Sequence, residues 1–280
     1  MPLEDELSDI LKKARTGQGL SVADVARVTG VPSGEITALE RGDPPLDRDG
    51  VRALAKGLGL RAEPLEQIAV DKWEPGTHPM PSWVERVEGT ISGYGVQGYI
   101  VHDGGEALLI DTAYNAPAML DLLRKYQLRL VGIGLTHGHV DHAEGIEEIL
   151  HQYDVPVYLG SDDIELLGWR PRPDQLVDPA DGHSVIVGRR TVHCFTTPGH
   201  TAGGVCYRVE DAQQPVCFVG DTLFAGSIGR SNPRELYPTH LQSVRSRLLS
   251  LAPQYRLLPG HGPATTVKEE LLHNPFVTLQ

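Results

Sequence analysis

The run V-G-I-G-L-T, which has the small and β-branched residues of a buried strand, leads directly into T-H-G-H-V-D-H at residues 136–142. Four side chains that can bind a metal ion therefore follow one strand: His137, His139, Asp141 and His142. Loops at the carboxyl ends of strands are where α/β proteins place their functional sites. Histidines two residues apart in such a loop can converge on one ion, and the Asp and His on the next turn can face a second. The motif predicts an α/β domain with two adjacent metal sites.

Three further segments repeat this arrangement of an apolar run followed by a potential ligand. They are T-P-G-H-T at 197–201, F-V-G-D-T at 218–222 and L-L-P-G-H-G-P at 257–263. Glycine and proline beside the ligand fix a tight turn, so that an imidazole or carboxylate projects in a defined direction. Any one of His200, Asp221 and His261 alone would be read as an ordinary loop residue. Their repetition predicts a seven-residue ligand set.

The texture of the chain beyond residue 84 is that of an α/β domain. Short apolar runs bounded by Gly, Asp and Pro predict strands at 98–102, 107–110, 130–135, 155–159, 185–187, 192–195, 205–209, 216–219 and 255–258. Helical spacing of apolar residues predicts helices at 117–126 and 241–251. Strands of both parallel and hairpin type are therefore expected.

The first part of the chain has a different pattern. Apolar residues at three-four spacing predict several short helices within residues 5–60, with Ser21 as an N-cap and Gly30 closing the helix that it begins. The proline-rich W-E-P-G-T-H-P-M-P-S-W at 73–83 favours an extended linker. We therefore expect an all-helical bundle at 1–70, a linker at 71–83 and a catalytic domain at 84–280.

Composition narrows the class of protein. The net charge of -12, from 37 acidic and 25 basic residues, opposes general nucleic-acid binding. The three cysteines, Cys194, Cys206 and Cys217, lie in apolar or β-branched runs and predict buried thiols and no disulfide framework. The N-terminal sequence lacks the basic and apolar blocks of a secretory signal, and no apolar stretch approaches about 18 residues. A cytoplasmic enzyme with no membrane partner is expected.

Taken together, these motifs resemble the metallo-β-lactamase superfamily from about Val84 to Phe276. The resemblance implies an αββα sandwich in which His137, His139 and His200 hold one metal ion. It implies that the second ion is held by the other three terminal ligands, Asp141, His142 and His261, and that Asp221 bridges the two. Asp141 and Asp221 would be the catalytic carboxylates, and Asp111 in L-L-I-D-T would position ligands without touching a metal.

The run F-A-G-S-I-G-R-S-N with P-G-H-G-P and H-N-P-F is similar to the glyoxalase II and persulfide dioxygenase branch. Two departures count: Asn232 stands where that branch usually has aspartate, and 17 residues after Pro263 are too few for the helical glutathione-binding extension of glyoxalase II. Arg230 and Asn232 are the candidate substrate contacts. For Arg230, a structural role in which it ties its loop together by hydrogen bonds is an equal alternative.

The expected activity is hydrolysis of a small ester or thioester by attack of a hydroxide that bridges two divalent ions. Zinc is favoured, with iron or manganese as alternatives, because histidine and carboxylate ligands suit all three. The resemblance also permits a second enzyme, a persulfide dioxygenase with one iron on His137, His200 and Asp221. A third reading, from another class, is a regulator that senses a ligand and binds DNA.

The segment L-S-V-A-D-V-A-R-V-T-G-V-P-S-G-E-I-T-A-L-E-R-G resembles the Cro/C1-type helix-turn-helix of repressors. The second helix of that motif normally supplies basic or amide side chains to the major groove. Here residues 32–40 offer Ser33, Thr37 and two acids, and residues 1–70 hold nine Lys and Arg against twelve Asp and Glu. A homodimer, or packing of the bundle on the catalytic domain, is therefore expected at least as much as DNA binding.

Overall fold

The computed structural model describes residues 1–44 and 47–277 of the chain. Its N-terminal part is a bundle of short helices: α1 (Leu7–Gly17), α2 (Val22–Thr29), α3 (Ser33–Leu39), α4 (Arg48–Gly57) and α5 (Ala62–Ala69). The predicted punctuation is present, because the Ser21 hydroxyl accepts from the backbone N–H of Asp24 at 3.1 Å and Gly30 ends α2 with φ of 76°. Helix α5 lies beyond the region that the apolar spacing had marked.

The rest of the chain forms two six-stranded sheets, each with its strands in sequence order. The first sheet contains β1 (Val84–Ile91), β2 (Tyr94–Asp103), β3 (Glu106–Ile110), β4 (Arg129–Gly134), β5 (Val157–Tyr158) and β6 (Leu176–Val177). The second contains β7 (Ser184–Val187), β8 (Arg190–Thr196), β9 (Val205–Val209), β10 (Val216–Gly220), β11 (Arg256–Pro259) and β12 (Thr265–Thr266). Strands β3 to β6 are parallel, as are β10 and β11, and the other pairs are antiparallel.

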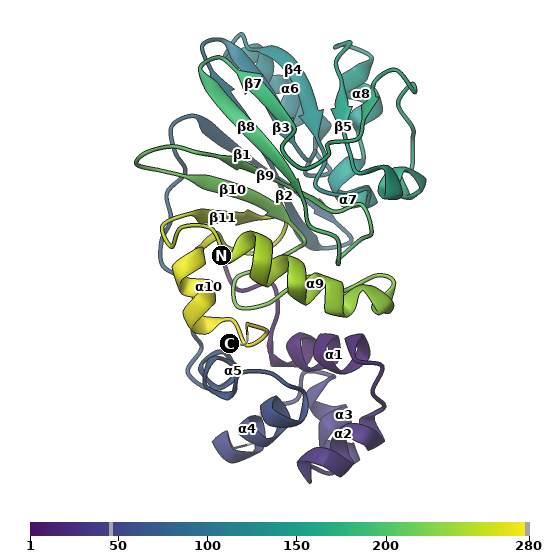
Figure 1. Ribbon diagram of the computed structural model, residues 1–280, viewed down its shortest axis with the longest axis vertical. Helices are drawn as coiled ribbons and strands as arrows, with labels where there is room; N and C mark the ends of the chain where they lie inside the picture. Colours follow the sequence, from purple (N-terminus) through teal and green to yellow (C-terminus); the bar gives the residue numbers. More distant parts are fainter. Residues whose placement is uncertain (45–46, 278–280) are drawn as a thin grey trace.

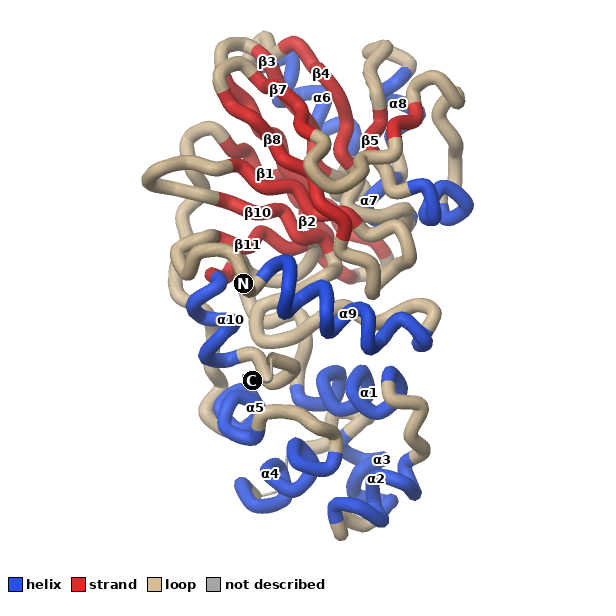
Figure 2. The backbone as a smooth tube through the Cα atoms, viewed as in Figure 1, coloured by secondary structure: helices blue, strands red, loops and turns tan. Residues whose placement is uncertain are grey.

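Helices cover the outer faces of both sheets, which makes the expected αββα sandwich (Figures 1 and 2). The first sheet is covered by α6 (Ala116–Lys125), α7 (Val140–Ala143) and α8 (Ile146–Leu150), and the second by α9 (Tyr237–Ser243), its π-helical continuation Val244–Leu248, and α10 (Val267–His273). Two 3-10 helices, Ser161–Leu166 and Arg234–Leu236, lie in the connections. Between the sheets, side chains such as Leu108, Tyr207 and Phe218 are fully buried and form a third apolar layer.

Helix α9 lies between the second sheet and the bundle, and α10 lies beside α5 (Figure 1). One continuous apolar cluster includes Leu11 of α1, Leu65 of α5, Val244 and Leu257. The backbone N–H of Arg61 also donates to the carbonyl of Pro275 at 2.8 Å. The bundle is therefore packed on the sandwich and shares part of its core.

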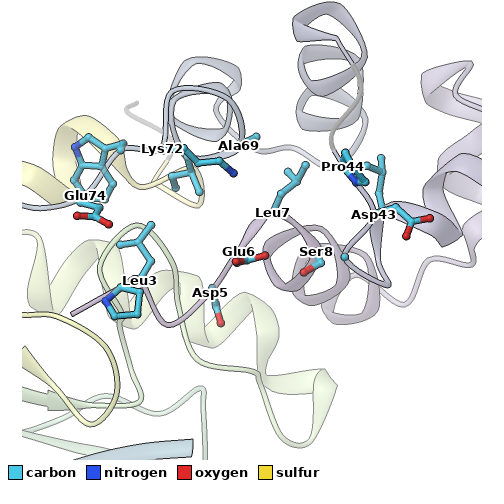
Figure 3. Close-up of a pocket in the computed structure, with 15 residues that line it drawn as sticks. Leu3, Asp5, Glu6, Leu7, Ser8, Asp43, Pro44, Ala69, Lys72 and Glu74 are labelled. Carbon is cyan, nitrogen blue, oxygen red and sulfur yellow. The ribbon is translucent and has the colours of Figure 1, made fainter.

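The segment between bundle and sandwich is extended and docks on α10. The Trp73 ring stacks on His273 with centroids 4.7 Å apart, and the His78 Nε2 lies 2.8 Å from a carboxylate oxygen of Glu269. A cavity of about 410 Å³ lies between this segment, the N-terminal residues and the bundle (Figure 3). None of the helices in the described ranges is long and apolar enough to cross a bilayer.

Candidate metal centre

The seven predicted ligands come from four strand ends at one edge of the sandwich. His137 and His139 follow β4 and lead into α7, which carries Asp141 and His142. The remaining three follow β8, β10 and β11, and they are His200, Asp221 and His261. The structure thus brings together all seven residues, although 124 positions separate the first from the last in the sequence.

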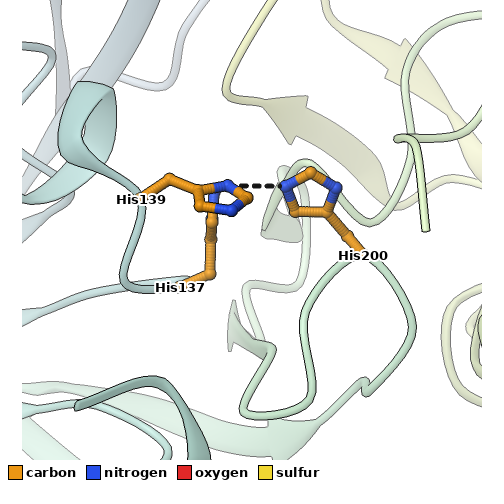
Figure 4. Close-up of side chains that lie close together, drawn as sticks. All are labelled: His137, His139 and His200. Atoms are coloured by element: carbon orange, nitrogen blue, oxygen red, sulfur yellow. Dashed lines mark hydrogen bonds between the residues drawn. The ribbon is translucent and has the colours of Figure 1, made fainter. Parts of the chain in front are cut away.

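The first cluster consists of His137, His139 and His200, whose rings face one another edge to face (Figure 4). The Nε2 of His200 lies 3.0 Å from the Nδ1 of His139. One candidate donor atom from each of the three residues lies within 4.8 Å of the other two. Three nitrogen donors at this spacing can hold one ion.

The second cluster lies next to the first. The Nε2 atoms of His142 and His261 are 3.4 Å apart, and the Oδ2 of Asp141 is 3.3 Å from the His261 Nε2. Asp141 also groups with His137 and His142 within 4.8 Å, so it lies near the border of the two clusters. Close approach here requires Gly260, because a Cβ at that position would lie 2.3 Å from the His142 ring.

Asp221 stands between the two clusters. Its Oδ1 is 3.3 Å from the Nε2 of His142 in the second cluster, and its Oδ2 is 3.6 Å from the Nε2 of His200 in the first. The Oδ2 is also 3.6 Å from the Nε2 of His261, so the carboxylate lies close to donor atoms of both clusters. This is the arrangement that a bridging carboxylate needs.

Two buried polar atoms without a hydrogen-bond partner among the residues that the structure describes also support metal binding by these residues. Within the described residues, the Nε2 of His137 and the Oδ1 of Asp221 are buried and have no hydrogen-bond partner. Buried polar atoms normally have a partner, because an unsatisfied one costs about 1–3 kcal/mol. Two such atoms that both face the cluster are accounted for if an ion is their partner.

Hydrogen bonds on the far side of the rings fix which nitrogen faces the centre. The Nδ1 of His200 donates to the carbonyl of Arg230 at 2.7 Å, and the Nδ1 of His261 donates to that of Gly95 at 2.6 Å. The Nδ1 of His142 lies 2.9 Å from the Oδ2 of Asp111. In each ring the Nε2 lone pair is thus left for the centre.

The electrostatics keep the bridging carboxylate charged. Burial alone would raise the pKa of Asp221, but His261, His142 and His200 hold that pKa well below its ordinary value. Burial lowers the pKa of His200 to about 4. For His261, burial acts in the same direction, but Asp221 and Asp141 prevail and raise its pKa to about 9. The centre therefore holds ionised carboxylates among histidines at neutral pH.

Two buried residues that support the centre had no sequence signal. Asp163 is fully buried and accepts from the backbone N–H of Gly138 at 3.2 Å and from the Thr201 hydroxyl at 2.7 Å, so it ties two ligand loops together. Its position in the run S-D-D-I-E-L is that of an ordinary surface acid. His240 is also fully buried, and its Nε2 donates to the carbonyl of Thr222 beside Asp221 at 2.8 Å.

The two candidate substrate residues contact the centre through their backbones. Arg230 accepts from His200 through its carbonyl, and the backbone N–H of Asn232 donates to the carbonyl of His200 at 2.9 Å. The Arg230 guanidinium forms no hydrogen bond to any described residue, so the side chain does not tie its loop together. Both side chains are exposed and line a cavity that also involves the bundle.

The bundle also reaches the loops of the centre. The Lys13 ammonium donates to the carbonyl of Ile228 at 2.9 Å and lies 4.8 Å from the centroid of the Phe224 ring. That ring in turn contacts His261 edge to face, with centroids 5.9 Å apart. A single side chain, that of Phe224, therefore lies between Lys13 of α1 and the candidate ligand His261.

The fold and the set of donor atoms define a metal-binding αββα protein. A family model described as the metallo-beta-lactamase superfamily matches residues 92–261, and one described as a helix-turn-helix domain matches residues 6–68. The first match covers more than half of the chain, which therefore belongs to the metallo-beta-lactamase superfamily. The fold of this family implies that divalent metal ions are bound.

Relatives of the chain match about two thirds of its length. An uncharacterized protein of Mycobacterium leprae is 34% identical over 205 residues, which cover 64% of this chain and 92% of that protein. The probable polyketide biosynthesis zinc-dependent hydrolase PksB of Bacillus subtilis is 27% identical over 189 residues, covering 64% of this chain and 80% of PksB.

Solved structures agree in fold. The BLEG-1 B3 metallo-beta-lactamase is 29% identical with a TM-score of 0.59 and covers 69% of this chain and 100% of its own. The protein TTHA1623, solved in a di-iron-bound form, is 30% identical with a TM-score of 0.57 and covers 68% of this chain and 100% of its own.

Proposed function

We propose that the chain is a binuclear metal-dependent hydrolase of small esters or thioesters. The observation that carries the proposal is the position of Asp221, whose Oδ1 lies 3.3 Å from the Nε2 of His142 and whose Oδ2 lies 3.6 Å from the Nε2 of both His200 and His261. A carboxylate between two sets of histidines holds two ions close together and offsets their mutual repulsion. The di-iron form of TTHA1623 and the name of PksB as a zinc-dependent hydrolase support two ions and zinc, respectively.

Two divalent ions bound there would lower the pKa of a shared water towards about 7 and stabilise the oxyanion formed on a carbonyl carbon. The residues of the chain supply the geometry for this chemistry. His137, His139 and His200 would hold one ion, and Asp141, His142 and His261 would hold the other. No side-chain nucleophile is needed.

The experiment is metal analysis of protein purified without added metal, together with thioester hydrolysis. We expect about two ions per chain, hydrolysis that a chelator abolishes, and loss of both the second ion and turnover in Asp221→Ala. One iron per chain with oxygen uptake on a persulfide would contradict the proposal and favour the dioxygenase. Asp221→Ala with the parent rate and metal content would exclude the bridging role.

The helix-turn-helix match favours a second candidate, binding of DNA. Helices α2 and α3 lie at the end of the molecule away from the sheets (Figure 1). The exposed residues of α3 include Ser33 and Glu35, and that helix has no cation for phosphates or base edges. Titration of labelled upstream DNA at physiological salt tests this candidate, and we expect no saturable, sequence-selective binding.

A further inference from the structure

A cavity of about 500 Å³ lies between the bundle and the catalytic part, and neither part would form it alone. One wall is the end of α1 and the turn into α2, with Lys12, Arg15 and Gly19. The other wall is the segment between β10 and α9, with Arg230 and Arg234. The Arg234 guanidinium lies 3.8 Å from a Cβ position built on Gly19, so the walls meet at that turn.

The charge of this cavity is opposite to that of the chain. Its lining contains five cationic side chains and no carboxylate, although the chain has a net charge of -12. The cations are Lys12, Lys13, Arg15, Arg230 and Arg234. The cavity in Figure 3 provides a contrast, because it is lined by four acidic side chains and a single lysine: Asp5, Glu6, Asp43, Glu74 and Lys72. An anion would therefore be attracted to the first cavity and repelled from the second.

Carboxylates behind the cavity wall neutralise part of this charge. The ammonium of Lys13 pairs with Asp5, the guanidinium of Arg15 pairs with Glu40 through two hydrogen bonds, and Arg234 pairs with Glu235 at the surface. In the described part of the chain, Lys12 and Arg230 have no acidic partner. Two uncompensated positive charges, 218 positions apart in the sequence, thus converge on one cavity.

Two residues that line the cavity form hydrogen bonds to the candidate metal ligand His200. Arg230 accepts the Nδ1–H of His200 with its carbonyl, while its side chain lines the cavity. Asn232 likewise binds the His200 backbone and lines the cavity with its side chain. The cavity therefore shares a wall with the segment that holds His200 in place.

From this arrangement we infer that the cavity binds a phosphate group of the substrate, so that the bundle acts as a substrate-binding element of the hydrolase. This inference rests on the proposed function, because a substrate is bound only if the chain is a hydrolase. Guanidinium and ammonium groups bind phosphate oxygens through charge-assisted hydrogen bonds, and the Asn232 amide adds a neutral donor. The substrate class is then a phosphate-bearing ester or thioester.

Binding is tested with phenyl phosphate by calorimetry on the intact, metal-loaded chain. Lys12→Gln removes one uncompensated charge that lies on the bundle and not on a ligand loop. We expect it to raise the Kd about tenfold, the size of one lost charge-assisted hydrogen bond. Arg27→Gln is the matched control, because Arg27 is an exposed cation of the bundle outside the cavity, and its Kd should equal that of the parent chain. An unchanged Kd in Lys12→Gln would mean that phosphate binds elsewhere, such as at the metals, and would overturn the inference.

Turnover is tested with two thioesters that share one acyl group, one with a phosphorylated thiol and one with an uncharged thiol. We expect Lys12→Gln to lower the ratio of kcat/KM for the charged over the uncharged thioester about tenfold, again by the loss of one such bond. Hydrolysis of both compounds with an unchanged ratio would overturn the inference and leave the proposed function standing. Hydrolysis of neither, with the effect on phenyl phosphate intact, would overturn the proposed function and leave a phosphate site.

Discussion

Asp111 shows how one residue can position several parts of the centre. Its Oδ1 accepts the backbone N–H of Thr136 at 2.7 Å, and its Oδ2 accepts from the Thr136 hydroxyl and from the Nδ1 of His142. Its backbone is left-handed, with φ of 56°, a conformation that aspartate and asparagine tolerate better than most residues. The expected supporting role of Asp111, without metal contact, agrees with these contacts and stays a prediction.

We expect Asp111→Asn to lower metal affinity of the second site about 10- to 100-fold while the fold is kept. Asparagine can adopt the same backbone, but its amide offers a donor where His142 needs an acceptor, so the ring loses its tautomer. Zinc affinity by competition with a chelating dye measures the effect, and circular dichroism checks the fold. Unchanged affinity for both ions would contradict the role.

Glu270 is a second residue whose surroundings affect a measurable property, the dependence of stability on pH. It is fully buried in α10, where it accepts from the backbone N–H of Gly226, the Thr265 hydroxyl and the Asn274 amide. Burial outweighs these hydrogen bonds and raises its pKa from 4.5 to about 7. The folded chain therefore holds a proton that the unfolded chain releases near pH 4.5, so this contribution to stability is present below that pH and is lost as pH rises through about 7.

We expect Glu270→Gln to gain stability relative to the parent chain by about 3 kcal/mol between pH 4 and pH 8. Any change in hydrogen bonding is common to both pH values and cancels in that difference. Urea unfolding of both chains at the two pH values gives the four free energies needed. A difference between the chains that is independent of pH would show that Glu270 titrates normally.

At the scale of elements, strands with a clear apolar pattern could be predicted from the sequence, whereas the shortest strands and the half-exposed strand β1 could not. All nine predicted strands lie at observed strands, because each is an apolar run bounded by turn residues. The sequence did not reveal β1, whose alternate residues are exposed and charged, or β6 and β12, which have two residues each. The ligands were recognisable because each follows a strand. Asp163 and the Lys12–Arg230 cavity depend on packing between distant segments and carry no local pattern.

Two helical glycines give a test of how α1 meets α9. A Cβ on Gly17 would lie 2.4 Å from the Tyr237 ring, whereas a Cβ on Gly34 in α3 meets nothing within 4 Å. We expect Gly17→Ala to destabilise the chain by about 1–3 kcal/mol through overpacking. Gly34→Ala should be neutral or stabilise it by about 0.4–1 kcal/mol, because alanine restricts the unfolded chain. Chemical denaturation compares them, and equal effects would mean that the two helices do not pack closely.

At the scale of the whole molecule, the bundle and the sandwich share apolar core. Tyr237 and Val244 on the sandwich side are 6% and 1% exposed, and both belong to the apolar cluster that contains the core residues of the bundle. The linker at 71–83 separates the two parts in the sequence, yet the structure packs them together through α1, α5 and α10. The domain boundaries at 70 and 83 remain a proposal about the sequence, and separability does not follow from them.

We expect removal of residues 1–72 to lower Tm by roughly 10 °C, since uncovering two large apolar side chains costs about 3–6 kcal/mol. The truncated chain should also associate through the exposed face of α9 and α10. Differential scanning calorimetry and light scattering of both chains measure the two effects. A truncated chain that is monomeric and has the parent Tm would show that the bundle contributes nothing to the stability of the sandwich.

The shared core has a consequence for synthesis of the chain. The bundle leaves the ribosome roughly 200 residues before Phe276 and Val277, which belong to the same apolar cluster. At about 5–20 residues per second, the contact face of the bundle waits roughly 10 to 40 seconds for its partner surface. The bundle is thus made well before the surface that completes its core, and the yield of folded chain in a cell depends on what shields that face during the interval.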